Sequence, residues 1–174
     1  AEVIIVGIEH GNEKRMDELT PYPNEKYGGG KADAYLDFIV TTLKPHIDTN
    51  YRTKTGKMNT AIAGSSLGGL VSYYAILKYP KIFGKAAIFS PSFWFNNTIY
   101  TLTESARNLK TKLYFMCGDS EGETTVANMD KMVDLVNDKR CTFMHLTKKV
   151  VIVNGKHNEK LWAKEFGKAY LWLF

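Results

Sequence analysis

The sequence has few cysteines and no long apolar run. Only two of its 174 residues are cysteines, Cys117 and Cys141, and they show neither a CxxC pair nor a Cys/His spacing typical of a metal site. Two thiols do not make a disulfide framework, so cysteine content does not indicate whether the protein resides in an oxidising or a reducing compartment. No apolar stretch approaches the roughly 20 residues that a membrane-spanning helix needs, so we expect no membrane span.

A strongly basic surface is also lacking. The formal charge is +5, but the lysines are dispersed and form no basic stripe interleaved with aromatics. Nucleic acid is therefore not an expected partner. The segment Gly28-Gly29-Gly30-Lys31 superficially resembles a phosphate loop, yet Ala32 stands where Ser or Thr should hold Mg²⁺ and Glu25 stands where the first glycine belongs. We interpret it as a loop that enters a helix.

The length and composition fit one globular domain over residues 1–174. Apolar residues make up 44% and charged residues 24%, as is usual for a soluble domain. The chain begins at Ala1 without an initiator Met or a signal-like segment and runs at once into the apolar stretch Val3–Ile8. We expect it to be the C-terminal portion of a longer domain, or a shortened one.

Short apolar runs alternate with helical periodicity along the whole chain. Expected strands are Val3–Ile8, Thr60–Ala63, Ala86–Phe89, Leu113–Cys117 and Val150–Val153. Expected helices cover the stripes Tyr35–Ile47, Leu67–Tyr79, Val126–Val136 and Trp162–Leu173. This order predicts an α/β fold, a mostly parallel sheet with helices on both faces. Ligands of such sheets bind at the carboxyl ends of the strands, so the residues just after each strand are the ones to inspect.

The segment after the second strand reads Ala63-Gly64-Ser65-Ser66-Leu67-Gly68-Gly69 and matches G-x-S-x-G centred on Ser66. Between a strand and a helix, this pattern makes a strained turn that lifts the serine hydroxyl above the sheet. The helix N-terminus beyond it offers free N–H groups to an oxyanion. Ser66 is therefore the candidate nucleophile, with the backbone N–H of Leu67 as one oxyanion donor.

A serine hydroxyl needs a base, and four histidines are available. His46 lies on a helix, His145 precedes the last strand at the wrong edge, and His10 comes before the serine. His157 follows the last strand, at the right edge and in the chain order serine, acid, histidine. We therefore expect His157 to be the base.

The acid should follow the strand Leu113–Cys117. The turn there reads Gly118-Asp119-Ser120-Glu121-Gly122 and offers two carboxylates, which would hold the imidazole in the correct tautomer. Spacing alone does not separate Asp119 from Glu121.

Four motifs carry a resemblance that covers nearly the whole chain. They are Ala63–Gly69, Phe89-Ser90-Pro91-Ser92-Phe93-Trp94, Cys117–Glu121 and Gly155-Lys156-His157-Asn158-Glu159-Lys160-Leu161-Trp162. In these motifs the chain resembles the Putative esterase family of α/β-hydrolases, which includes esterase D-like, feruloyl, acetylxylan and siderophore esterases and mycolyl acyltransferases.

The resemblance implies the α/β-hydrolase fold, with Glu121 as the acid beside Ser66 and His157. It implies no metal or organic cofactor, and it suggests that Arg15 orients an anionic or polar group of the substrate. In the family the second oxyanion donor comes from the loop after an earlier strand, which lies in the sheet between the first two strands expected here. The sequence shows no such strand. Trp94, which follows a strand at the active edge, is expected to wall a substrate pocket.

These residues predict a serine esterase that forms an acyl-enzyme on Ser66. The expected substrate is a small-molecule ester with a polar acyl group, aromatic or linked to a carbohydrate. Two alternatives stay open: an acyltransferase of the same superfamily, and a non-catalytic binding domain. The acyl and alcohol groups, the oligomeric state and the compartment are not indicated by the sequence.

Overall fold

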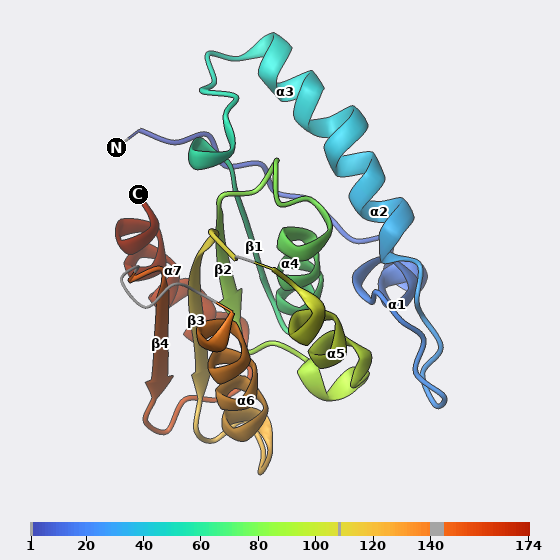
Figure 1. Ribbon diagram of the computed structural model, residues 1–174, viewed down its shortest axis with the longest axis vertical. Coiled ribbons are helices and arrows are strands. Elements are labelled where there is room, and N and C mark those ends of the chain that lie inside the picture. Colours follow the sequence, from blue (N-terminus) through green and yellow to red (C-terminus); the bar gives the residue numbers. More distant parts are fainter. Residues whose placement is uncertain (1, 108, 140–144) are drawn as a thin grey trace.

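The computed structural model describes residues 2–107, 109–139 and 145–174, so Cys141 lies outside the described residues. In this part of the chain four strands form one sheet in the order β1-β2-β3-β4 (Figure 1). The strands are β1 (Ala61–Ser65), β2 (Lys85–Phe89), β3 (Lys112–Gly118) and β4 (Thr147–Ile152). Every neighbouring pair is parallel, so all four carboxyl ends lie at one edge.

Helices cover the expected stripes, and two more lie outside those stripes, at Arg15–Leu19 and Thr98–Ser105. The helices are α1 (Arg15–Leu19), α2 (Ala32–Phe38), α3 (Lys44–Asn50), α4 (Leu67–Lys78), α5 (Thr98–Ser105), α6 (Thr125–Asp138) and α7 (Glu159–Leu173). A π-helical turn, Ile39–Leu43, joins α2 to α3, and short 3₁₀ turns lie at Asn12–Lys14, Lys57–Asn59 and Phe93–Phe95. Among the described residues, none of these helices is long and apolar enough to cross a membrane.

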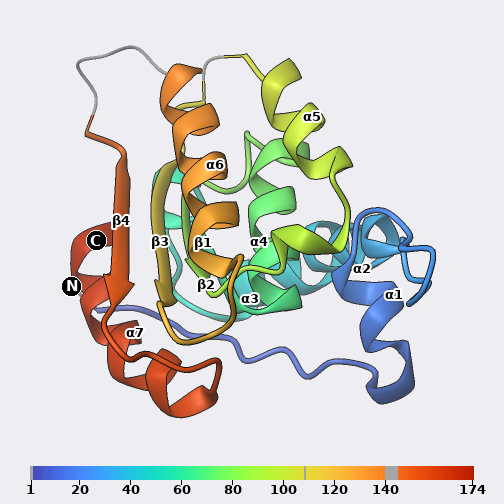
Figure 2. The same ribbon diagram turned by 90° about the horizontal axis from the view of Figure 1, so that it is seen from below.

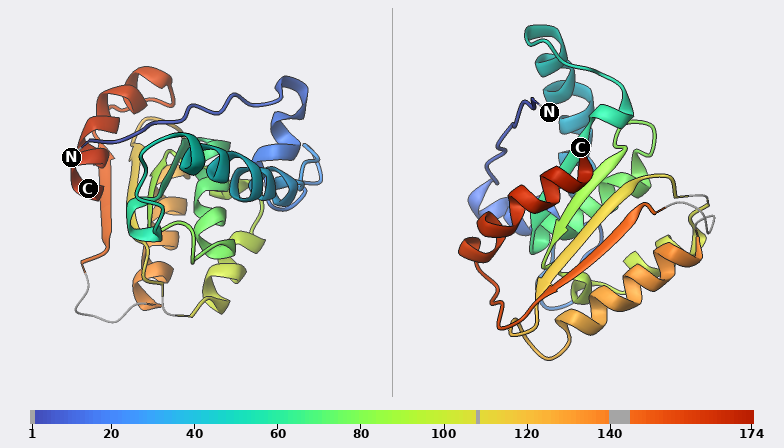
Figure 3. Two further views of the ribbon diagram at one scale, coloured as in Figure 1. Left: turned by 90° about the horizontal axis from the view of Figure 1, so that it is seen from above. Right: turned by 90° about the vertical axis from the view of Figure 1, so that its left-hand side faces the viewer.

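The sheet is covered on both faces. In β2, Ala86 and Ile88 pack in the larger apolar cluster with α4 and α6, whereas Ala87 and Phe89 pack in a smaller cluster with α7. Figures 2 and 3 show α4 and α6 on one side of the strands and α7 on the other. Because successive strand residues point to opposite faces, a strand that is apolar throughout must be buried on both sides. The predicted α/β fold is confirmed.

The expected first strand is wrong. Val3–Ile8 runs as an extended coil, and its five large apolar side chains are between 40% and 65% exposed. None of its backbone groups is hydrogen-bonded to β1 among the contacts of the described residues. An apolar run forms a strand only when another strand takes its backbone hydrogen bonds. The edge of β1 does not do so here.

Candidate active site

The turn after β1 places Ser66 at the carboxyl edge of the sheet. Ser66 has φ 59° and ψ −122°, a strained conformation for a residue with a side chain. Its N–H donates to the carbonyl of Phe89 at the end of β2, and its carbonyl accepts from the N–H of Ser92. These bonds hold the strained turn against the neighbouring loop.

The two glycines of the motif have different roles. A Cβ on Gly64 would overlap the backbone carbonyl of Gly68, whereas a Cβ on Gly68 would have open space around it. The turn therefore requires glycine at position 64 because strand and helix backbones meet there.

Leu67 is the first residue of α4, and helix starts leave their first N–H groups without an intrahelical acceptor. Within the described residues, the N–H of Leu67 has no hydrogen-bond acceptor. The group expected to bind an oxyanion is thus unoccupied by the chain's own carbonyls.

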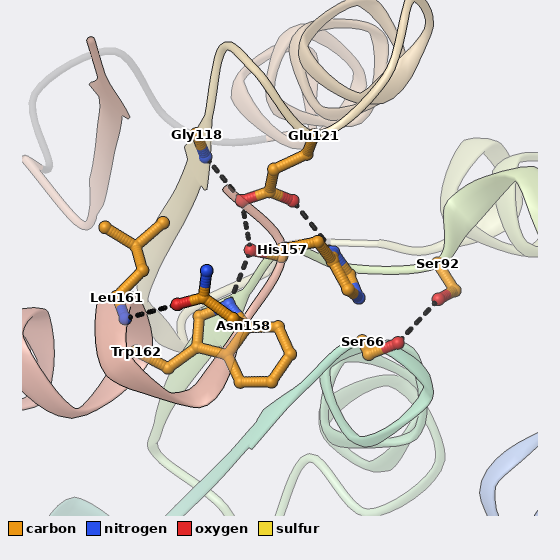
Figure 4. Close-up of polar contacts among 9 residues, drawn as sticks. Ser66, Ser92, Gly118, Glu121, His157, Asn158, Leu161 and Trp162 are labelled. Carbon is orange, nitrogen blue, oxygen red and sulfur yellow. Dashed lines mark hydrogen bonds and ion pairs between the residues drawn. The ribbon is translucent and has the colours of Figure 1, made fainter. Parts of the chain in front are cut away.

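His157 and Glu121 meet across two loops. Nδ1 of His157 lies 2.9 Å from Oε2 of Glu121, whose side chain is fully buried, while the imidazole is 39% exposed. A carboxylate accepts the hydrogen bond of Nδ1–H and so leaves Nε2 as the basic nitrogen. Figure 4 shows the ring extending from Glu121 toward the side where Ser66 and Ser92 lie. Among the described contacts no hydrogen bond joins the ring to Ser66.

Asp119 points elsewhere. Its Oδ1 accepts from the N–H of Asn154 and from the hydroxyl of Ser120. The backbone of Asn154 has φ 57°. The hydrogen bond to Asp119 therefore stabilises a strained backbone conformation in the loop that carries His157. The geometry therefore distinguishes the two carboxylates that spacing left open: Glu121 contacts the imidazole and Asp119 holds the loop.

Three residues that the sequence reasoning gave no role also lie in the site. The hydroxyl of Ser90 donates to Oε1 of Glu121 at 2.7 Å and accepts from the indole N–H of Trp162 at 2.7 Å. The hydroxyl of Ser92 lies 3.4 Å from that of Ser66. These residues stand within the motifs that carry the family resemblance, but their hydrogen bonds join segments that lie far apart in the sequence.

Cys117, at the end of β3, is no rival nucleophile. It is fully buried, and burial, together with the negative charge of Glu121, raises the pKa of its thiol to about 12. At neutral pH the sulfur stays protonated and inert. In the described part of the chain no group of three or more His, Cys, Asp or Glu side chains is arranged to hold a metal.

Among the described contacts, neither of the two expected substrate contacts is hydrogen-bonded to His157 or Glu121. Arg15 begins α1 and lines, with Ser65 and Gly68, a groove of about 1290 Å³ beside β1. Trp94 lies two residues after Ser92, and its 53% exposed ring packs edge-on against Tyr27 at 6.0 Å between ring centroids.

Similarity in sequence to known proteins extends over between about half and nearly all of the chain. The model of the family described as "Putative esterase" matches residues 1–173. An uncharacterized protein of Bacillus subtilis, YbbA, is 33% identical over 99% of this chain and 74% of its own length. A siderophore enterobactin esterase of Emericella nidulans is 35% identical over 51% of this chain and 28% of its own length.

Solved structures share the fold. The BES protein of Bacillus cereus superposes with a TM-score of 0.75 at 21% identity, over 94% of this chain and 64% of that one. The enterobactin esterase FES of Shigella flexneri gives 0.76 at 15% identity, over 95% and 41%. The chain thus spans less than two thirds of either structure. These likenesses establish the α/β-hydrolase fold, and the chain belongs to the Putative esterase family.

Proposed function

We propose that this chain carries the active site of a serine esterase. The observation that supports it best is that Glu121, fully buried, orients His157 at the edge of the sheet where the strained turn presents Ser66. Family membership supports hydrolysis of esters. The serine mechanism is our inference from the geometry.

In the proposed reaction, Oγ of Ser66 attacks the ester carbonyl while Nε2 of His157 takes the hydroxyl proton. The N–H of Leu67 stabilises the oxyanion of the tetrahedral intermediate. His157 then gives its proton to the leaving alcohol, and an acyl-enzyme remains on Ser66. His157 then takes a proton from water as the water attacks the acyl-enzyme, and it returns this proton to Oγ of Ser66 when the carboxylic acid is released. Glu121 stabilises the imidazolium in both halves.

We propose Trp94 and Arg15 as substrate contacts. The exposed pair Trp94–Tyr27 offers a surface on which a planar acyl or alcohol group can stack. The guanidinium of Arg15 suits a carboxylate or another polar group. Relatives named as siderophore esterases support a small ester as the substrate, and a relative named as a feruloyl esterase supports an aromatic acyl group. Trp94→Ala is expected to lower kcat/KM for an aromatic acyl ester about threefold to tenfold and to leave an acetyl ester unaffected.

A fluorophosphonate probe tests the nucleophile. We expect labelling of the native chain at Ser66, located by peptide mass spectrometry, which disappears in Ser66→Ala and persists in the adjacent control Ser65→Ala. A native chain that stays unlabelled would refute the esterase and favour a non-catalytic binding domain. If alcohols added to an activated ester give mainly transfer product rather than acid, the enzyme is an acyltransferase.

A further inference from the structure

We propose that Ser90 and Trp162 are positioning residues that hold the carboxylate of Glu121 toward His157. This inference rests on the proposed function and deepens it. It concerns three hydrogen bonds and one ring contact that join the ends of β2 and β3 to the start of α7 (Figure 4).

Both oxygens of Glu121 have partners. Oε1 accepts from the Ser90 hydroxyl at 2.7 Å and from the N–H of Gly118 at 2.6 Å, and Oε2 faces His157 at 2.9 Å. The side chain is fully buried. Since a buried carboxylate is stable in its charged form only when hydrogen bonds replace water, the two donors on Oε1 stabilise that form.

The direction of this chain of bonds is fixed by chemistry. An indole N–H can only donate a hydrogen bond, so Trp162 is the donor and the oxygen of Ser90 is the acceptor. The single hydroxyl proton of Ser90 is then directed to Glu121. Trp162 therefore sets the orientation of the hydroxyl, and the hydroxyl sets the orientation of the carboxylate.

Two further features point to a role beyond packing. Ser90 has φ 43°, a conformation that glycine adopts without strain but serine does not. The residue is only 1% exposed, so its strained backbone and its hydroxyl both lie inside the protein. The ring of Trp162 also packs edge-on against that of His157, with centroids 4.9 Å apart. Trp162 thus restrains both the base and the support of its acid.

Titratable groups near the pair include Cys117, Asp119, Lys156 and Glu159, while Asp130 and Lys149, which also act on Cys117, pair with each other. From β3 the Cys117 thiol is held protonated by its raised pKa. Asp119, in the same turn as Glu121, is occupied by Asn154 and Ser120. Lys156 and Glu159, beside His157 on its own loop and helix, are exposed to solvent. Changes in titration after removal of the Ser90 hydroxyl would therefore report on Glu121 and His157.

Ser90→Ala removes one donor from Glu121 and leaves the backbone unchanged. The carboxylate and the imidazole paired with it then bind protons more tightly. We expect kcat to fall about tenfold with little change in KM, and the acid limb of the pH–rate profile to move up by about half a unit. Ser105→Ala is the matched control, since this exposed hydroxyl donates to the Thr101 carbonyl within α5, and it should change neither quantity.

Trp162→Phe keeps a ring beside His157 but removes the N–H, and the matched control on the same helix is Trp172→Phe. Because Trp162 acts through Ser90, the double variant Ser90→Ala/Trp162→Phe should have the kcat of Ser90→Ala alone. Fully additive losses, or an unmoved acid limb in folded Ser90→Ala and Trp162→Phe, would overturn the proposal.

An NMR titration of the His157 ring protons separates this inference from the esterase proposal. We expect the midpoint to move to higher pH in Ser90→Ala whether or not the chain turns over an ester. A native chain that hydrolyses no ester, but whose imidazole titration is shifted in this way, would refute the esterase and keep the positioning network. An active chain with an unshifted titration would do the reverse.

Discussion

Two parts of the molecule contrast sharply. At the carboxyl edge of the sheet, loops after β2, β3 and β4 converge, and the polar side chains that meet there hydrogen-bond one another. On the other side of β1 lies a groove of about 1290 Å³ with largely apolar walls, one of them the exposed segment Val3–Ile8. The first region is tightly connected and the second is loosely packed.

The difference shows what apolar sequence does and does not determine. Exposure of an apolar run such as Val3–Ile8 to water is unfavourable. Its burial, however, also requires hydrogen-bond partners for its backbone groups. The strands β2 and β3 have such partners on both edges. The loops at the carboxyl edge follow strands that already pair in the sheet. Their side chains are therefore close enough to hydrogen-bond one another without a further strand.

The largest expected effect lies at the carboxyl edge. Glu121→Gln keeps the size of the side chain but removes the charge that orients and stabilises the imidazolium, so ester turnover should fall by about 10³- to 10⁴-fold. Asp119→Asn is the matched control, since its Oδ1 can still accept from Asn154, and it should change kcat only slightly. Steady-state kinetics on an aryl ester measure both variants. Equal losses would mean that the two carboxylates share the role.

A pair of isoleucines tests the contrast in packing directly. Ile88 in β2 is fully buried, and Ile88→Ala should cost about 2–5 kcal/mol of unfolding free energy. Ile5 is 65% exposed, and Ile5→Ala should change the unfolding free energy by no more than about 0.5 kcal/mol. Urea unfolding gives both values. A large cost at Ile5 would show that Val3–Ile8 is buried in solution.

The groove wall itself contains a second matched pair, Gly64 and Gly68. Gly64→Ala forces a Cβ against the Gly68 backbone and should cost about 1–3 kcal/mol. Gly68→Ala meets open space near the start of α4, and the better helix propensity of alanine should leave the stability unchanged or raised by up to about 1 kcal/mol. Thermal unfolding distinguishes them, and a reversed order would contradict the described turn.

The smallest effect concerns α2, whose Tyr35 lines the groove beside β1. Asp33 accepts a hydrogen bond from Tyr74 at 2.7 Å and pairs with Lys78 at 2.6 Å, and the bond from Lys78 is the main cause that lowers the pKa of this carboxyl. A lowered pKa means that the stabilisation is present above the ordinary value of 3.8 and is lost as pH falls through the folded value.

Because Asp33 is 60% exposed, solvent screens this pair and its contribution should stay below about 1 kcal/mol. Native chain and Asp33→Asn should therefore differ slightly in urea unfolding at pH 6 and converge at pH 2. A difference that grows toward acid would have the wrong sign.

Much of the fold was predictable from local pattern. The strands β1 to β4 and the helices α4, α6 and α7 all lie where periodicity and turn residues placed them, within a few residues. The strand expected at Val3–Ile8 failed because periodicity reports which residues tend to be buried and says nothing about a neighbour.

The positions of the candidate residues at the strand ends were predictable in the same way, whereas their catalytic roles stay predictions. Ser66, His157 and a carboxylate after β3 follow from strand ends and chain order. The network of Ser90 and Trp162 does not, since these residues are 72 positions apart and only the folded sheet brings them within 2.7 Å. The role of Asp119 likewise depends on a contact with Asn154, 35 residues away.

The acyl-enzyme itself is the most direct test of the account. The chain is mixed with p-nitrophenyl acetate, quenched in acid before steady state, and digested for peptide mass spectrometry. We expect one acetyl group on Ser66, absent in Ser66→Ala and present in Ser65→Ala. Release of p-nitrophenol with no acetyl group on Ser66, or with the acetyl group on another residue, would contradict the account.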